Sequence, residues 1–531
     1  MNNPGSRIAL ALAVVACAAQ PGAALALSYD YGDWLFNVDT SLTAAMQWRT
    51  ESRDKQALDD PLDPYRNLDD GNNNFDPGLV SAKGSFILEL GAVYGDLSFF
   101  LRSDGLYDYV YENKNSDMSA RHYATYNGAI PNGGQVQLGD YPKGTLDEHG
   151  QRLRLLEAFV NYQFELGERL GSLRVGSQLI AWGEATIYQG VNTMQNPIDG
   201  GVALSPGVEA KEIFLPTPAV DLKYDLTDGL SAEAYYKLKW AKTTQPGVGS
   251  FLSTSDFTGP GAQRILLGSA GAGEVRSADK PGNGGQWGAA LRYLTEGGTN
   301  FTLSYNNNHA NAPGSQIVFD PLNGSYTREV YLKDIEFWQF SVATNLGEAL
   351  VYADFAYSDN APFIDQTRYL NERRQLVAAD VSRATYRQLV VGMTDVYTAF
   401  PWLSRQIALT AELLYQDNSV GEGDKTGTPY IATDDAWGYQ ALAILKYFSV
   451  LPGMDVDVTL SFRQDVDGYG SAALKNNLIE GQKWASLGFN AVYLTNWEFA
   501  AKYSFYFGND DRDEPVLSDR DNLALSVKYK F

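Results

Sequence analysis

The chain has 531 residues, a formal net charge of −23 and 13% aromatic residues, together with 51 Gly and one Cys. Abundant aromatic residues and Gly favour strands and turns over helices. The acidic balance argues against a nucleic-acid partner, because phosphate binding requires basic patches.

The first 26 residues have the pattern of a cleaved signal peptide. Arg7 supplies a positive charge, the apolar stretch 8–16 follows, and Ala24 to Ala26 offers small residues for cleavage. We therefore predict export and a mature chain that begins at Leu27. A lipoprotein signal that ends at Cys17 is the alternative. Under the first interpretation the mature chain has no cysteine, which excludes disulfide and thiolate chemistry.

The rest of the chain is rich in period-two stretches. No later apolar run approaches the ~20 residues of a membrane helix, so a membrane-embedded form has to be a closed β-barrel. Apolar and polar residues alternate along 36–49, 454–463, 497–507 and 523–531. Each stretch has about ten residues, as a tilted strand needs to cross a bilayer. A soluble sheet with one buried face shows the same alternation.

The connections between these stretches favour the membrane class. Tight turns are expected at 94–96, 227–229, 295–299, 345–349 and 494–497, and long polar loops at 51–78, 112–150, 243–284 and 358–381. Short turns at one end and long loops at the other are typical of outer-membrane barrels. We predict a single all-β, transmembrane, antiparallel β-barrel of the Gram-negative outer membrane over residues 27–531. We expect about 18 strands, with 16 possible, short periplasmic turns and long extracellular loops.

The last strand is unusually regular for a chain terminus. Leu523, Leu525, Val527, Tyr529 and Phe531 share one face, and polar or small residues occupy the other. A terminal Phe with apolar residues at alternate positions before it resembles the signal that the barrel-assembly machinery recognises, and Tyr529 and Phe531 match it. This strand should pair with the first one, because closure removes both edges of the sheet.

The polar faces of the strands are expected to line the interior. Charged side chains there can set solute selectivity, whereas the same charges facing lipid would be costly. A wall of paired charges that selects no solute is the alternative. The inward candidates are Glu89, Arg102, Asp104, Arg174, Gln178, Trp182, Glu184, Glu233, Tyr235, Lys237 and Lys239.

Residues 173–218 form the most informative internal stretch. We expect a strand that carries Trp182 and Glu184 on its inner face, followed by a connection rich in Gly, Asn and Pro. This connection holds apolar residues such as Phe214, which suggests burial. We hypothesise that residues 188–218 fold back into the barrel as a constriction or partial plug. An ordinary packed surface loop is the alternative.

Metal and enzymatic signals are weak. Asp69, Asp70 and Asp76 offer oxygen ligands for calcium, but without the spacing of an EF-hand loop. An acidic, turn-rich loop near divalent-bridged lipopolysaccharide is the alternative. The histidines of the chain are His122, His149 and His309. No serine motif accompanies them, so a hydrolase is the weakest hypothesis, and we predict neither a catalytic site nor a cofactor.

Four segments carry a family pattern. They are RLLEAFVNYQF from Arg154, GSQLIAWGEATIYQGVN from Gly176, NPID from Asn196 and SPGVEAKEIFLPTPAVDLKYDLTDGLSAEAYY from Ser205. They resemble a large proteobacterial family of outer-membrane proteins catalogued as domain of unknown function 1302. Members usually have Ser on both sides of the Trp-Gly-Glu motif, where this chain has Ala181 and Ala185.

The resemblance implies traffic in lipids or other hydrophobic compounds, because family genes often lie beside those of an inner-membrane exporter of the RND type. We predict a passive outer-membrane channel or transporter for small, hydrophobic or amphiphilic molecules. The alternative is a closed barrel that serves as a scaffold or docking component of an envelope transport complex. Outer-membrane lipid and lipopolysaccharide, the barrel-assembly machinery and the exporter are the expected partners.

Overall fold

The computed structural model describes the chain from residue 27 onward with several gaps. The gaps are 54–66, 68–69, 114–140, 190–194, 267–271, 319, 321–323, 365–379, 399, 401, 421–431, 472, 475 and 509–516. The predicted signal peptide, Cys17 and His122 therefore lie outside the described residues.

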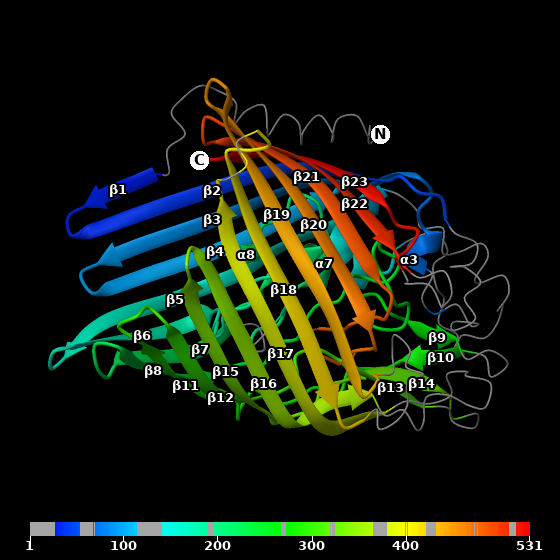
Figure 1. Cartoon of the computed structure of the whole chain (residues 1–531). Coiled ribbons are helices and arrows are strands. Elements are labelled where there is room, and N and C mark those ends of the chain that lie inside the picture. Colours follow the sequence, from blue (N-terminus) through cyan, green and yellow to red (C-terminus); the bar gives the residue numbers. More distant parts are fainter. Residues whose placement is uncertain are drawn as a thin grey trace.

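One sheet of 19 strands dominates the structure, and all of its strands except β1 form a closed antiparallel ring (Figure 1). The ring thus has the 18 strands that the sequence predicts. Each strand pairs with the next ring strand along the chain. Their bounds are β2 (Trp34–Arg49), β3 (Gly78–Tyr94), β4 (Leu97–Asp108), β5 (Gln151–Leu166), β6 (Arg169–Gln178), β7 (Thr217–Asp225), β8 (Leu230–Lys237), β11 (Trp287–Leu294), β12 (Asn300–Asn308), β15 (Ile335–Leu346), β16 (Ala349–Ile364), β17 (Val381–Tyr397), β18 (Gln406–Asn418), β19 (Asp435–Leu451), β20 (Met454–Asp467), β21 (Lys483–Tyr493), β22 (Trp497–Phe507) and β23 (Asn522–Lys530).

The ring closes where β23 pairs with β2, as the terminal strand predicts. The register runs from Arg49 opposite Asn522 to Ser41 opposite Lys530. Phe531 then exchanges two backbone hydrogen bonds of 2.7 and 2.9 Å with Thr40. The short strand β1 (Leu27–Tyr31) pairs with the part of β2 that β23 leaves open. The chain terminus is thus fixed in the seam of the barrel.

The two ends of the ring differ as predicted. Eight short connections lie at one end: 95–96, 167–168, 226–229, 295–299, 347–348, 398–405, 452–453 and 494–496. Gly167 and Gly347 both adopt φ of +67° there, as tight hairpin turns require. The other end carries nine longer connections: 50–77, 109–150, 179–216, 238–286, 309–334, 365–380, 419–434, 468–482 and 508–521.

The long connections contain the remaining elements. A small sheet lies beyond the ends of the ring strands, at the right in Figure 1. It comprises β9 (Arg264–Leu266), β10 (Ala272–Val275), β13 (Gly314–Val318) and β14 (Tyr326–Val330). The helices are α3 (Asp70–Asn73), α4 (Tyr109–Asn113), α6 (Lys143–Thr145), η3 (Leu146–Gly150), α7 (Gly200–Ala203) and α8 (Ala210–Ile213). None of the helices that the structure describes is long and apolar enough to cross a membrane.

The distribution of side chains inverts that of a soluble protein. Along β15 every second residue from Ile335 to Ala343 is buried, and these include Gln339 and Ser341, whereas Trp338 is 54% exposed on the outer face. Large apolar residues cover the outside of other strands in the same way, for example Leu291 and Leu303. A polar interior inside an apolar outer surface is the arrangement of a transmembrane barrel.

Two strand ends differ from the prediction. β6 ends at Gln178, so Trp182 and Glu184 belong to the following connection and not to a strand. The chain leaves the wall there because its next backbone amides bond to side chains on other strands, and Gly183 adopts φ of +98°. β8 ends at Lys237, so Lys239 lies beyond the strand and is exposed.

The seam register gives the first prediction. Ala45 and Ser526 lie directly opposite each other on the inner face, in a non-hydrogen-bonded pair, where side chains approach most closely. An Ala45→Cys, Ser526→Cys variant expressed from residue 27 should form a disulfide on oxidation, seen as a mobility shift that reductant reverses. Ala45→Cys with Ala524→Cys is the matched control and should stay open. Equal cross-linking of both pairs would contradict the register.

Candidate functional site

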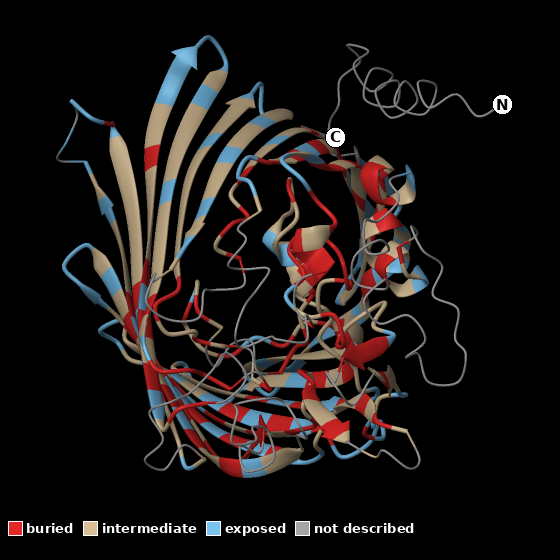
Figure 2. Ribbon diagram, turned by 90° about the vertical axis from the view of Figure 1, so that its right-hand side faces the viewer, coloured by how far each residue is buried: buried red, intermediate tan, exposed pale blue. Residues whose placement is uncertain are grey.

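The connection between β6 and β7 runs through the interior of the ring. We call its described residues, 179–189 and 195–216, the lumen segment. In Figure 2, which looks into the ring, buried parts of the connections lie inside it. The hydrogen bonds of the lumen segment reach β16, β18, β5 and β23, which are spread around the whole ring. The segment therefore crosses the lumen and does not lie on the outer surface.

Asp354 on β16 makes the first attachment. Its carboxylate accepts the backbone amides of Glu184, at 2.9 and 3.0 Å, and of Ala185, at 2.8 Å. Asp354 is 1% exposed, and a buried carboxylate is stable only when such donors satisfy it. The amides, which have no strand partner, are satisfied by the same bonds.

Glu412 on β18 makes the second attachment, one residue farther along. Its carboxylate accepts three successive backbone amides, those of Thr186 at 2.6 Å, Ile187 at 3.0 Å and Tyr188 at 2.6 Å. The hydroxyl of Tyr352 donates a further hydrogen bond of 2.8 Å. Two wall carboxylates thus hold the backbone of residues 184–188.

Residues 188 and 189 contact the part of the wall that lies opposite β6. The guanidinium of Arg463 on β20 lies 5.3 Å from the ring centroid of Tyr188. The amide of Gln189 donates to Asn476 Oδ1 at 3.1 Å, in the connection between β20 and β21. Residues 179–189 therefore extend from β6 to the opposite side of the ring.

Trp182 packs residues 179–189 against the wall at β8. It is fully buried, and its ring lies 5.2 Å from that of Tyr235 on β8. A Cβ on Gly288 would approach the Tyr235 ring to 2.6 Å and the Trp182 ring to 3.0 Å, so glycine allows the two rings to pack this close to β11. The carboxylate of Glu184 accepts a hydrogen bond of 2.8 Å from Asn300. Trp182 and Glu184, both predicted to face inward, are inside the ring and packed against its wall.

The second half of the lumen segment is held by charge. Asp199 caps α7 through Val202 N at 3.0 Å and forms ion pairs with Arg152 at 3.0 Å and Arg154 at 2.6 Å. Burial opposes ionisation of Asp199, but the two guanidinium groups hold its pKa below the usual value. Asp199 is therefore ionised at neutral pH and ties α7 to β5.

The strands at the seam of the barrel bind the residues at α8. Glu209, which precedes α8, pairs with Lys528 on β23 at 2.7 Å. Lys211 pairs with Glu89 on β3 at 3.2 Å. The second half of the lumen segment therefore spans from β5 to the closing strands.

The predicted lumen residues on β3 and β4 form ion pairs. Arg102 binds Glu89 at 2.6 Å and also contacts Glu157. Asp104 binds Arg154 at 2.6 Å. These residues face the interior, as the strand alternation predicts, and their charges are compensated by one another.

The predicted lumen residues on β6 make different contacts. The guanidinium of Arg174 lies 4.8 Å from the centroid of Phe159, and Gln178 donates to the carbonyl of Ala219 at 3.0 Å. Both side chains lie on the inner side of the wall. Their role in solute selection stays a prediction.

The predicted lumen residues on β8 are also buried. Glu233 lies 3.4 Å from Lys223 and 3.7 Å from Arg292. Lys237 donates to the backbone carbonyl of Gln195 in the lumen segment. Together with Lys239 outside the strand, these residues complete the set that sequence reasoning proposed.

Sequence reasoning missed the two carboxylates that hold the lumen segment. Asp354 and Glu412 lie on period-two strands, in YADFAY and TAELLY, where alternation places them on the inner face. A single acidic residue on an otherwise uncharged inner face was the available signal. Their partners were not predictable, because Glu412 and Ile187 are 225 residues apart.

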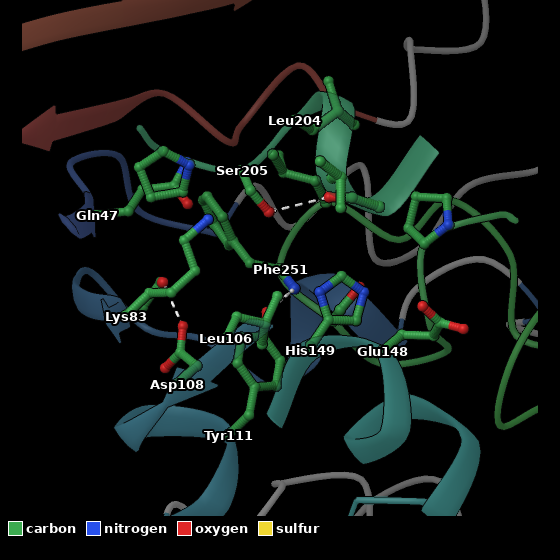
Figure 3. A pocket seen from close by; sticks show the side chains of 17 residues that line it. Gln47, Lys83, Leu106, Asp108, Tyr111, Glu148, His149, Leu204, Ser205 and Phe251 are labelled. Carbon is green, nitrogen blue, oxygen red and sulfur yellow. Dashed lines mark hydrogen bonds between the residues drawn. The ribbon is translucent and has the colours of Figure 1, made fainter. Parts of the chain in front are cut away.

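Two cavities flank α7 and α8. Figure 3 shows the smaller, of about 40 Å³, where Lys83, Asp108 and His149 gather beside Ser205. Burial lowers the pKa of His149 to about 4, so it is neutral at pH 7. His149 Nε2 accepts the amide of Gly247, and Ser205 donates to the carbonyl of Gly201. In these bonds the histidine and the serine do not form a nucleophile–base pair.

The larger cavity, of about 320 Å³, lies between α8 and the seam. It is lined by Asp39, Glu89, Glu209, Lys211 and Lys530, among others. Both acidic and basic side chains line it, and Asn496 of a short turn is among the lining residues, so it is a polar compartment on the side of the short turns.

Two of the three residues proposed for calcium, Asp70 and Asp76, lie in the described part of the chain. Asp76 forms an ion pair with Arg53 at 2.5 Å, and the amide of Asp70 bonds to Asp256 at 3.3 Å. Asp69 lies outside the described residues. Within the described part of the chain, no group of three or more His, Cys, Asp and Glu side chains is placed to hold a metal ion.

Several solved structures resemble this chain at low sequence identity and with TM-scores below 0.5. A BenF-like porin from Pseudomonas fluorescens is 9% identical, with 93% of this chain and 98% of that chain covered and a TM-score of 0.44. OccAB1 from Acinetobacter baumannii is 10% identical, with 93% and 96% covered and a TM-score of 0.44. Pseudomonas aeruginosa OpdK with vanillate is 10% identical, with 93% and 98% covered and a TM-score of 0.41.

No curated protein matches this sequence. A family model described as "Protein of unknown function (DUF1302)" matches residues 7–531, which is nearly the whole chain. The expected family resemblance is therefore confirmed, and the protein belongs to the DUF1302 family.

Proposed function

We propose that the protein is a channel of the bacterial outer membrane for small amphiphilic molecules, narrowed by the lumen segment. The observation that carries this proposal is the attachment of residues 184–188 to Asp354 and Glu412 on the opposite wall. A ring of this size encloses a passage, and a segment fixed across it sets the width of that passage. The mechanism is passive, and no chemical step is involved.

The walls on the two sides of the lumen segment differ in chemistry. From β3 to β8 the inner face is charged, with ion pairs such as Arg102 with Glu89 and Arg154 with Asp104. From β12 to β17 it carries amides, hydroxyls and aromatic rings, among them Gln339, Phe337 and Tyr386. A solute with both apolar and polar parts matches this second wall, which supports an amphiphilic solute over a purely apolar one.

The first test is single-channel conductance in a planar lipid bilayer. We expect small, steady steps from the full protein and larger steps from a variant that lacks Asn192 to Ala210, because the deletion removes α7 and its ion pairs from the lumen. No gain in conductance or solute flux on deletion would contradict the constriction. Silence from both proteins would contradict the channel and favour a scaffold.

The second test concerns the attachment at Glu412. A hydrogen bond to a charged group contributes about 1.5–3 kcal/mol. Glu412→Ala should therefore raise the fraction of molecules whose lumen segment is released from β18 at least roughly tenfold. We expect additional, larger open states in single-channel recordings. Glu336→Ala is the matched control, since Glu336 is exposed on the outer face of β15. Identical recordings from both variants would contradict the role of Glu412.

A further inference from the structure

The larger cavity, between α8 and the seam, has the size of a ligand site. Its volume of about 320 Å³ is twice the roughly 150 Å³ of a cavity that binds benzene. Its lining comes from β2, β3 and β23 of the ring, from the lumen segment at α8, and from Asn496 in a short turn. The cavity therefore lies between the lumen segment and the wall, at the end of the ring that carries the short connections.

The basic side chains that line this cavity already have acidic partners. Lys211 binds both Glu89 and Glu209, at 3.2 and 3.3 Å. Lys530 binds Glu498 at 3.0 Å. Each of the two acids beside Lys211 has a second basic partner on the ring. The cavity therefore offers no unpaired cation to an anionic solute.

Asp39 is the charged lining residue that differs. It is exposed on β2, and its carboxylate forms no hydrogen bond or ion pair with the residues that the structure describes. In the pairing of β2 with β3 it lies directly opposite Glu89. Like charges directly opposite each other destabilise a sheet. A cation beside Asp39 would reduce this repulsion, so the cavity favours a positively charged ligand.

The rest of the lining suits an organic body better than a bare metal ion. Ile87 contributes an apolar side chain, and Ser41 and Asn496 are polar and neutral. Such a mixed lining accommodates carbon atoms beside a charged group. A metal ion needs several ligands together, and the described part of the chain has no group of three or more His, Cys, Asp and Glu side chains placed to hold one.

We infer that this cavity binds a small organic cation, whose single ammonium group pairs with the carboxylate of Asp39. The inference rests on the proposed channel function and names its solute class. A solute that enters from the side of the long connections reaches this cavity after it has passed the lumen segment.

The test is binding of four probes to the full chain in deuterated detergent, measured by saturation-transfer difference NMR at pH 7. Butylammonium, 1-butanol and butyrate share one carbon chain and differ in charge. We expect butylammonium to bind at least about tenfold more tightly than 1-butanol, as a hydrogen bond to a charged group provides. Butyrate should bind most weakly of these three.

The fourth probe, glycerophosphoethanolamine, separates a free amine from a lipid headgroup as the source of the ammonium group. It carries a phosphate together with its ammonium group. We expect it to bind more weakly than butylammonium, because the lysines of the cavity are already paired and the phosphate would lie close to acidic side chains.

An Asp39→Asn variant locates the binding. It keeps the shape of the side chain and removes its charge, so it should weaken butylammonium binding at least about tenfold. Asp96→Asn is the matched control, since Asp96 is exposed in the short turn 95–96 and does not line the cavity. Asp39→Asn should unfold at a temperature no lower than the unchanged chain, because it removes the like charge opposite Glu89. The comparison of probes on the unchanged chain requires no variant to fold.

Three results would overturn the inference. They are equal affinity for butylammonium, 1-butanol and butyrate, equal weakening by Asp39→Asn and Asp96→Asn, and binding of glycerophosphoethanolamine as tight as that of butylammonium. Because binding is measured at equilibrium and without a membrane potential, this failure is separate from that of the channel itself. A conducting barrel without a preference for the amine would overturn only the solute class, and selective binding to a silent barrel would overturn only the channel.

Discussion

Pairing of β23 with β2 is the constraint on which the other features depend. Inside lipid, each unpaired backbone group costs several kcal/mol, so a strand ring is stable only when it has no edge. The seam satisfies this requirement down to Phe531, whose amide and carbonyl both bond to Thr40. Closure at 18 strands also sets the width of the ring, and that width leaves room for a chain segment inside it.

The lumen segment and the barrel wall satisfy each other's buried polar groups. The segment's backbone amides lie inside the barrel without strand partners, and Asp354 and Glu412 on the wall form no ion pair with the residues that the structure describes. Each group satisfies the other, so segment and wall form one unit. On the other side, Asp199 and Glu209 bind cations of β5 and β23. The charges of the wall from β3 to β8 are thereby paired, and the wall from β12 to β17, whose carboxylate Asp354 is satisfied by the lumen segment, is left to contact solutes.

The architecture was predictable because it follows from local patterns. Alternation along 36–49 and 523–531 and the unequal connections are enough to give a barrel of about 18 strands with its long loops at one end. The same alternation placed Glu89, Arg102 and Asp104 correctly on the inner face. It did not predict that β6 ends before Trp182 and Glu184, because alternation says nothing about where a strand stops bonding to its neighbour.

The site was less predictable because its contacts join distant parts of the chain. Nothing near residues 184–188 indicates that their amides will meet carboxylates on β16 and β18. The most direct test of the account is amide hydrogen exchange of the peptide containing Thr186, Ile187 and Tyr188 in the full protein. We predict protection comparable to that of the barrel strands, because these amides bond to Glu412. Exchange as fast as in an unstructured peptide would contradict a lumen segment fixed to the wall.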